Sequence, residues 1–191
     1  MFEQTPGVEW SGRDDSKVEV GDTWRLFQIV KSDIGIDSAV SGSVGIIGFQ
    51  SDEGVRRNKG RPGAVDGPIV LREALANLPA YDMQELYDFG NVKVETELEE
   101  GQELLGEKVA SLLEKGVFPV VLGGGHEVAF GTFLGLNHFL EQTDPRRERN
   151  LVILNLDAHF DVRASRPASS GTPFDQIFQA IQRPYQYVNS F

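Results

Sequence analysis

Hydrophobic residues along the chain occur in short continuous runs and in longer stretches where they recur at helical spacing. The short runs predict buried strands at 44–49, 86–89, 118–122 and 151–156. Helical spacing predicts helices at 68–78, 98–115 and 128–140, and a helix start at 172–180. Strands that alternate with helices in this way are typical of βαβ units. The pattern therefore predicts a three-layer α/β domain built on a parallel sheet.

The two ends of the chain differ from this middle part. Residues 1–40 are polar and weakly periodic, which predicts an irregular arm with a short helix from about Trp24 to Ile29. After residue 180 no further strand is evident before Phe191, so we expect the sheet to lack its C-terminal part. The predicted organisation is an N-terminal arm, 1–42, followed by the N-terminal portion of an α/β domain, 43–191.

Composition and charge narrow the classes of function. A net charge of −11 argues against a nucleic-acid-binding surface, because such surfaces are basic. The absence of cysteine excludes disulfides, zinc ribbons and thiol nucleophiles, and it fits a reducing compartment. The N-terminal residues do not have the pattern of a signal peptide, and no apolar run approaches the ~20 residues of a membrane span. We therefore expect a cytoplasmic protein that binds neither nucleic acid nor membrane.

The residues with the clearest chemistry follow two of the predicted strands. Asp157, His159 and Asp161 come directly after the strand at 151–156, and His126 follows a run of three glycines after the strand at 118–122. Parallel sheets build their sites at such strand ends. In an extended segment alternate side chains point the same way, so the three residues after the later strand should converge. Carboxylates with imidazole bind divalent ions such as Mn²⁺, Zn²⁺ or Fe²⁺, and a carboxylate can bridge two of them.

Each of these motifs also has a plainer interpretation. The cluster after residue 156 could form hydrogen bonds to the loop backbone instead of binding metal. The glycines at 123–125 could cradle a phosphate, but neither the G-x-x-x-x-G-K-[ST] nor the G-x-G-x-x-G spacing is present. A simpler role for the glycines is to let the backbone turn tightly and bring His126 close to the other strand end. Two histidine-bearing strand ends together favour a metal site.

The motifs resemble those of the ureohydrolase (arginase/agmatinase) superfamily. The resemblance runs from about residue 43 to 182 and depends on three sequences: GVRRNKGRPGA at 54–64, GGGHE at 123–127 and NLDAHFDVR at 155–163. GGGHE, where arginases have Asp before the His and Ser after it, is most similar to the formimidoylglutamases of histidine degradation. The sequence SSGTPF at 169–174 is also most similar to the formimidoylglutamases.

The resemblance implies a metal centre and a reaction. It implies hydrolysis of N-formimidoyl-L-glutamate to L-glutamate and formamide by a hydroxide activated by two Mn²⁺ ions, with Asp157 and His159 as catalytic residues. An arginase- or agmatinase-type hydrolase is the alternative. The metal ligands that the resemblance implies are His126, Asp157, His159 and Asp161. Two further aspartate ligands of the superfamily belong to an S-x-D-x-D motif that this sequence lacks. Superfamily members are also longer, so the chain is expected to be an N-terminal portion of such an enzyme or an inactive truncated remnant.

The resemblance also implies substrate-binding residues. Arg163 stands where arginases have an Asn that binds the amino-acid end of the substrate, and Phe174 stands where they have a His. Because a guanidinium pairs with a carboxylate in bidentate fashion, Arg163, Ser169 and Ser170 are expected to bind the carboxylates of a dicarboxylate substrate. Arg163 could equally form a loop-stabilising salt bridge, and the serines could cap the following helix. The expected partners are a small-molecule substrate and, in a homo-oligomer, further copies of the chain.

Overall fold

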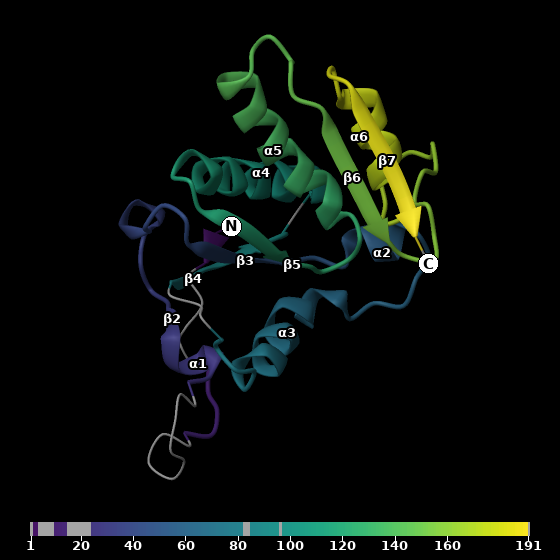
Figure 1. Ribbon diagram of the computed structural model, residues 1–191. Helices are drawn as coiled ribbons and strands as arrows, with labels where there is room; N and C mark the ends of the chain where they lie inside the picture. The colour runs from purple at the N-terminus through teal and green to yellow at the C-terminus, as the bar shows by residue number, and fades with distance from the viewer. Residues whose placement is uncertain (1, 4–9, 15–23, 82–84, 96, 191) are drawn as a thin grey trace.

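The structure is a computed structural model that describes residues 2–3, 10–14, 24–81, 85–95 and 97–190. Its strands and helices form two sheets with helices packed against them (Figure 1). The strands are β1 (Phe2–Glu3), β2 (Val30–Lys31), β3 (Val44–Gln50), β4 (Leu86–Lys93), β5 (Phe118–Leu122), β6 (Leu151–Leu156) and β7 (Tyr185–Ser190). The α-helices are α1 (Leu26–Ile29), α2 (Glu53–Arg57), α3 (Gly67–Ala76), α4 (Leu98–Glu114), α5 (Val128–Thr143) and α6 (Pro173–Ala180). Short 3₁₀ helices lie at Ile36–Ser38 and Ala64–Asp66.

The larger sheet has the order β1-β4-β3-β5, and β2 also pairs with β4. Strands β2 to β5 are parallel to their neighbours, and β1 is antiparallel to β4. One face packs on α4 through a buried cluster that includes Phe49, Phe89 and Leu105. The opposite face packs on α1 and α3 through a second cluster that includes Ile46 and Leu86. The two faces bury alternate side chains of the same strands, which gives the predicted three-layer arrangement.

Strand β4 extends to Lys93 instead of ending at Phe89, although it contains buried polar residues. Arg72 of α3 compensates for the burial of these polar residues by forming hydrogen bonds to them. Its Nε and Nη2 donate to the two carboxylate oxygens of Asp88 at 2.7 and 2.8 Å, and its Nη1 donates to Asn91 Oδ1 at 2.8 Å. Gly90, at φ 85°, offers its carbonyl oxygen to the same guanidinium. This buried charge pair is thus fully hydrogen-bonded, the condition under which a buried charge is tolerated.

The smaller sheet consists of β6 and β7, which run parallel with Leu151 opposite Tyr185 and Leu156 opposite Ser190. The expectation that no strand follows residue 180 is therefore wrong. The strand was not evident from its sequence, YQYVNS, because polar residues interrupt the apolar ones. The expectation that the strand at 151–156 is buried holds for one face only: Val152, Leu154 and Leu156 are 59%, 60% and 76% exposed.

Helix α5 connects the two sheets. It packs on α4 beside the larger sheet and on α6 beside the smaller one. A third buried cluster joins Phe133 of α5 to Phe174 and Ile177 of α6, with Leu151 and Ile153 of β6 packed against it. Between β5 and β6 lies an open, largely apolar cleft of about 390 Å³ that is lined by residues of both strands and of α5 and α6. His126 is one of the residues that line this cleft.

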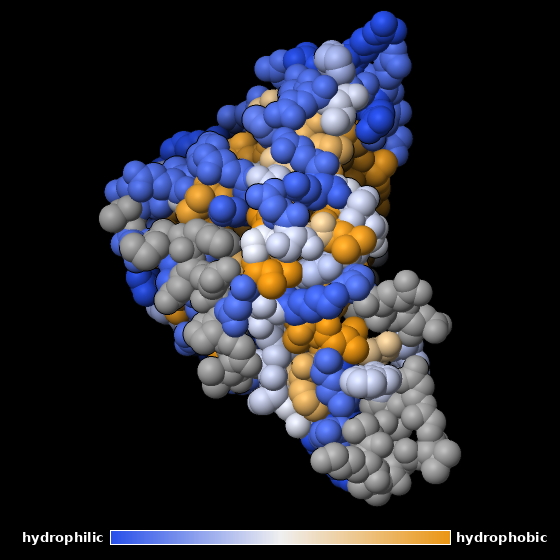
Figure 2. All heavy atoms as spheres, turned by 90° about the vertical axis from the view of Figure 1, so that its left-hand side faces the viewer, coloured by the Kyte–Doolittle hydropathy of each residue, from blue (hydrophilic) through white to orange (hydrophobic). Residues whose placement is uncertain are grey.

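The face that lies on the left of Figure 1 is mostly hydrophilic in its upper part, and its hydrophobic spheres form small separate patches (Figure 2). None of the helices in the described ranges is both long enough and apolar enough to span a membrane.

Candidate metal centre

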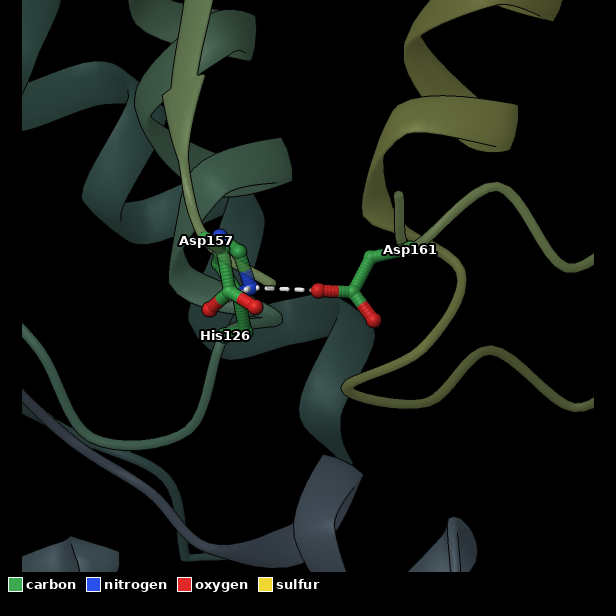
Figure 3. Close-up of side chains that lie close together, drawn as sticks. All are labelled: His126, Asp157 and Asp161. Carbon is green, nitrogen blue, oxygen red and sulfur yellow. Dashed lines mark ion pairs between the residues drawn. The ribbon is translucent and has the colours of Figure 1, made fainter. Parts of the chain in front are cut away.

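Three of the four predicted ligands meet at one point (Figure 3). His126 lies in the loop between β5 and α5, whereas Asp157 and Asp161 follow β6. The His126 Nδ1 atom is 2.7 Å from Asp161 Oδ2 and 4.0 Å from Asp157 Oδ2. One ligand atom from each residue lies within 4.8 Å of the other two. An imidazole nitrogen and two carboxylate oxygens at this spacing could all bind one divalent ion.

Glycines hold the His126 loop against the end of β3. The backbone N–H of Gly124 donates to the Phe49 carbonyl, and that of Gly125 donates to the Ser51 carbonyl, each at 3.0 Å. A Cβ atom on Gly124 would lie only 2.4 Å from the Ser51 oxygen. The close approach of the two backbones therefore requires glycine here, in agreement with the role expected for the three-glycine run.

His159, the fourth predicted ligand, lies outside this group of three and is exposed over 80% of its side chain. The expectation that residues 157, 159 and 161 alternate along an extended segment is wrong, because the chain bends at 157–159 and Asp161 has a φ of 47°. The bend is held by Asp157 Oδ1, which accepts the backbone N–H of His159 at 2.8 Å. This hydrogen bond is the main reason that the pKa of Asp157 is lowered.

The two carboxylate oxygens of Asp157 nevertheless face different histidines. Its Oδ2 atom is the one nearer to His126, and its Oδ1 atom lies 3.2 Å from Nδ1 of His159. Asp157 thus lies between the imidazoles of His126 and His159.

Glu127 anchors the segment that follows β3 to the loop that contains His126. Its buried carboxylate accepts the backbone N–H of Gly54 at 2.9 Å and the hydroxyl of Ser51 at 3.2 Å. Burial raises the pKa of this carboxyl group. Its own carbonyl accepts the side chain of Gln102 from α4 at 2.8 Å. Glu127 thus connects α2, α4 and the loop of His126. The sequence did not reveal this role, because it shows only that Glu127 is next to His126.

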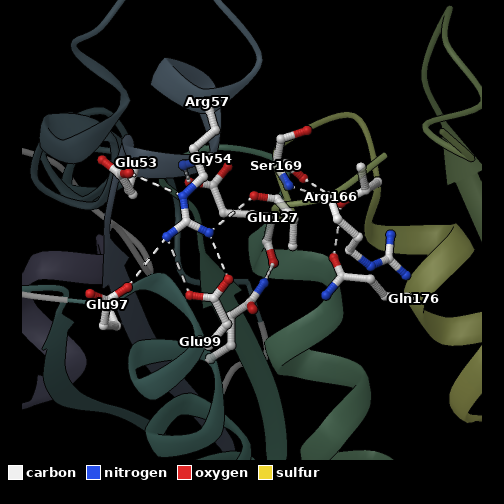
Figure 4. Close-up of polar contacts among 12 residues, drawn as sticks. Glu53, Gly54, Arg57, Glu97, Glu99, Glu127, Arg166, Ser169 and Gln176 are labelled. Carbon is white, nitrogen blue, oxygen red and sulfur yellow. Dashed lines mark hydrogen bonds and ion pairs between the residues drawn. The ribbon is translucent and has the colours of Figure 1, made fainter. Parts of the chain in front are cut away.

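Arg57 makes a second connection in the same region (Figure 4). Its guanidinium donates to Glu99 of α4 at 2.6 Å, to Glu53 at 3.1 Å and to the carbonyl of Ala168 at 3.2 Å. The hydrogen bond from Arg57 lowers the pKa of Glu99. These contacts fix the position of α2 and of the segment that precedes Ser169.

The predicted substrate-binding residues lie along the chain from Asp161. The Asp161 carbonyl accepts the backbone N–H of Phe174 at 3.2 Å, and the backbone N–H of Arg163 donates to the Gly171 carbonyl at 3.0 Å. The segment that contains Asp161 and the turn at 169–171 therefore run side by side. The side chain of Arg163 donates from Nη1 to Asn58 Oδ1 at 2.8 Å. Within the described ranges it forms no ion pair, so the loop-stabilising salt bridge considered for it is not seen there.

The two serines differ in their surroundings. Ser169 is buried, and its Oγ accepts the backbone N–H of Gly171 at 3.3 Å within the turn. Ser170 is half-buried, and its Oγ accepts the side-chain amide of Asn58 at 3.2 Å. Neither serine is the N-cap of α6, because that position is Thr172. Sequence reasoning missed Asn58, since both of its partners lie more than 100 residues away.

Comparison with known proteins identifies the family. The sequence pattern of the arginase family matches residues 42–189. The chain belongs to the arginase family. Its relatives include the formimidoylglutamase of Cupriavidus pinatubonensis, which is 50% identical over 184 residues covering 94% of this chain and 57% of the relative. The formimidoylglutamase of Klebsiella pneumoniae is 42% identical over 194 residues, which cover 98% of this chain and 59% of the relative. This arginase-family chain thus spans little more than half the length of these relatives.

Solved structures agree with the family assignment. The crystal structure of Trypanosoma cruzi formiminoglutamase with Mn²⁺₂ superposes with a TM-score of 0.67 at 32% identity, covering 83% of this chain and 53% of that chain. Formimidoylglutamase from Bacillus subtilis superposes with a TM-score of 0.66 at 23% identity, covering 84% and 50%. The second similarity supports the fold alone. Both confirm the predicted α/β architecture and the expectation that this chain corresponds to part of a longer fold.

Proposed function

We propose that this chain is part of an enzyme that hydrolyses N-formimidoyl-L-glutamate to L-glutamate and formamide with two Mn²⁺ ions. One observation carries the proposal: Asp161, which meets His126 and Asp157, is two residues from Arg163, which presents an exposed guanidinium. A metal-binding group and a carboxylate-binding group thus stand on one short segment. The relatives named formimidoylglutamase, at 42–50% identity, support the same reaction.

The donor set fits manganese. Imidazole nitrogen and carboxylate oxygen are suitable ligands for Mn²⁺. His126, Asp157 and Asp161 would hold one ion, and Asp157 and His159 would contribute to the second. When bound, such ions lower the pKa of water and stabilise negative charge that develops on the substrate.

The chain's own residues would orient the ligands and the substrate. The ring of Phe174 packs edge-on against the imidazole of His126, with centroids 5.5 Å apart, and so fixes the plane of the imidazole. The Nδ1 atom of that ring faces Asp161 Oδ2 at 2.7 Å and Asp157 Oδ2 at 4.0 Å, so all three atoms face the same point. Arg163 would bind a substrate carboxylate through its remaining N–H groups, and Ser170 would add a hydroxyl donor. Ser169 would act through the turn, because its own hydroxyl is buried there.

An arginase- or agmatinase-type activity is the second candidate, because the chain belongs to the same family. Agmatine is cationic and has no carboxylate, so a guanidinium beside its binding site would repel it. An inactive protein that binds metal without turnover is the alternative from another class. A cytoplasmic location and a homo-oligomeric state remain predictions.

The test is made on the protein expressed from the complete reading frame that contains these residues. After reconstitution with Mn²⁺, we expect two ions per subunit by elemental analysis and turnover of formimidoylglutamate in preference to arginine and agmatine. One ion or none would contradict the binuclear centre. Turnover of a guanidino substrate alone would select the second candidate, and metal binding without any turnover would select the inactive protein.

Two ligand variants refine this test. Asp157→Ala should abolish activity, because Asp157 would serve both ions. His126→Ala would remove a ligand of one ion only and should leave residual turnover that increases with Mn²⁺ concentration. Wild-type activity in the Asp157 variant would refute the ligand assignment.

A further inference from the structure

Asn58 connects the two residues that are expected to bind the substrate. Its side-chain oxygen accepts Nη1 of Arg163 at 2.8 Å, and its side-chain nitrogen donates to Oγ of Ser170 at 3.2 Å. Both contacts are long-range, across 105 and 112 residues of sequence. A single amide group therefore sets the relative positions of a guanidinium and a hydroxyl.

The direction of these hydrogen bonds leaves both partners able to bind an anion. Ser170 uses its oxygen as the acceptor for Asn58, so its O–H remains available as a donor. Arg163 uses one N–H on Nη1, and the side of its fork formed by Nε and Nη2 makes no hydrogen bond or ion pair among the described residues. That free side is the one that can pair with a carboxylate in bidentate geometry. The amide is neutral, so it orients the guanidinium without cancelling its charge.

The position of Asn58 is itself fixed with respect to the metal ligands. Its backbone N–H donates to the Gly54 carbonyl at 3.0 Å, and that carbonyl also accepts the backbone N–H of Ser170 at 3.0 Å. The N–H of Gly54 is held by Glu127, the residue next to His126. Around the amide the packing is tight: a Cβ on Gly171 would lie 3.3 Å from both Asn58 Nδ2 and Arg163 Cδ. Through these contacts the position of the Arg163 guanidinium is fixed relative to the metal centre.

We propose that Asn58 is a positioning and specificity-determining residue that holds Arg163 and Ser170 as a clamp for one carboxylate of the substrate. This inference rests on the proposed function, since it takes the substrate to be a dicarboxylate. Asn58 would select for carboxylate-bearing substrates through the orientation of Arg163, and it would take no part in the chemical step.

The proposal is tested with Asn58→Ala, Asn58→Asp and Arg163→Ala in the complete Mn²⁺-loaded protein. For formimidoylglutamate, Asn58→Ala should raise KM about tenfold with kcat changed less than about twofold, because the contact stabilises ground and transition states alike. Asn58→Asp keeps the size of the side chain but adds a carboxylate, which would occupy Arg163 itself. Its KM should therefore rise further, by roughly 100-fold or more.

Two readouts separate this positioning role from a merely structural one. Mn²⁺ content and Tm should match the wild type in Asn58→Asp. In a double-mutant cycle, Asn58→Ala should add little to Arg163→Ala, because both changes disrupt the same clamp. An unchanged KM in Asn58→Ala, additive effects in the cycle, or a fall in kcat at constant KM would each overturn the proposal.

Binding of L-glutamate, measured by calorimetry, distinguishes this inference from the proposed function. L-Glutamate offers the same carboxylates without any chemical step, and agmatine serves as the ligand without a carboxylate. If formimidoylglutamate is not hydrolysed but Asn58→Ala still weakens glutamate binding about tenfold, the clamp stands and the proposed reaction fails. If the wild-type protein does not bind glutamate, or the variant binds it equally well, the clamp is refuted.

Discussion

The larger and the smaller sheet of this protein are stabilised in different ways. In the larger sheet β3 and β4 are paired on both edges and covered on both faces, and residues such as Ile47, Phe49 and Val92 are inaccessible to solvent. The smaller sheet has two strands, with α6 on one face and exposed apolar side chains of β6 on the other. An isolated two-stranded sheet is marginal in water, so the stability of β6 and β7 depends on α5 and α6.

The candidate metal ligands are divided between these two regions. His126 comes from the loop that is held against β3, and Asp157 and Asp161 come from the end of β6. Because β5 and β6 are not paired with each other, the regions meet through helices and the third hydrophobic cluster. Hydrogen bonds from Arg57 to Ala168 and between Asn58 and Ser170 add to this contact. The geometry of the site therefore depends on side-chain packing between the regions more than on sheet hydrogen bonds. Four predictions test this difference, in order of decreasing effect.

The largest effect is expected inside the larger sheet. Arg72→Met would leave the buried carboxylate of Asp88 without its counter-ion and should lower the free energy of unfolding by about 3–5 kcal/mol. The loss should be global and visible as a lower urea midpoint. The double variant Arg72→Met/Asp88→Leu should recover part of the stability. Arg146→Met, which changes an exposed arginine 3.9 Å from Glu148, is the matched control and should cost less than about 1 kcal/mol. Equal costs for the two arginines would contradict the prediction.

The second prediction concerns the packing that joins the regions. Phe174→Ala removes a buried ring that packs on His126 and on Tyr187, at centroid distances of 5.5 and 5.0 Å. We expect a loss of about 3 kcal/mol, within the range for a buried Phe→Ala change. Hydrogen exchange should show reduced protection of the backbone amides in β6, β7 and α6, while those of β3 and β4 stay protected. Mn²⁺ should bind more weakly. The control Phe178→Ala, which removes ring contacts to Tyr185 and Tyr187, should loosen the same sheet with a smaller effect on Mn²⁺. Equal loss of protection in β3 would show that the regions unfold together.

The third prediction uses pH to weaken the smaller region. Asp144, at the end of α5, accepts the backbone N–H of Arg149 at 2.9 Å and Nη1 of Arg183 at 2.8 Å. The first contact, and then the second, lower the pKa of Asp144 below its ordinary value of 3.8. A carboxyl group with a lowered pKa stabilises the fold above its ordinary pKa, and this contribution is lost as the pH falls through the lowered value.

Thermal unfolding followed from pH 7 to about pH 3 should therefore show an acid-induced loss that is smaller in Asp144→Asn. The variant should have a lower Tm than the wild type at pH 7, and the two should approach each other in acid. Parallel pH profiles for the two proteins would show that Asp144 does not contribute to the acid-induced loss.

The smallest effect is expected on the open face of β6. Leu154→Lys changes an exposed side chain, so the free energy of unfolding should stay within about 0.5 kcal/mol of the wild type. Removal of an exposed apolar group should also reduce self-association, as measured by light scattering. The adjacent Ile153→Lys places a charge against the third hydrophobic cluster and should destabilise the smaller sheet strongly. Similar results for the two variants would mean that β6 is covered alike on both faces.

The same contrast explains how much the sequence could predict. The predicted strands at 44–49, 118–122 and 151–156 and the predicted helices at 98–115 and 128–140 agree with β3, β5, β6, α4 and α5, because local hydrophobic periodicity decides these elements. Strand β7 escaped notice, since pairing with β6 and packing on α6 stabilise it more than its own composition does. Strand β4 was predicted too short, because the partner that compensates for Asp88 and Asn91 lies in another element.

For the site, the sequence predicted residue types better than orientations. It identified His126, Asp157 and Asp161, which do meet. It could not predict the turn at Asp157, where a side chain competes with extended backbone, so the direction of His159 came out wrong. The sequence could not predict the role of Asn58, because its partners Arg163 and Ser170 come near it only in the folded chain.

The buried network around Arg72 also limits how this sequence can change over evolutionary time. Arg72 donates hydrogen bonds to both Asp88 and Asn91, and a Cβ on Gly48 would lie 2.0 Å from Asn91 Oδ1. Replacing one member alone leaves a buried charge or amide without its partner, and such neighbouring effects are not additive. A lineage could therefore exchange this polar set for an apolar one only by changing several positions almost together. These four positions should accordingly vary as a group among descendants of this chain.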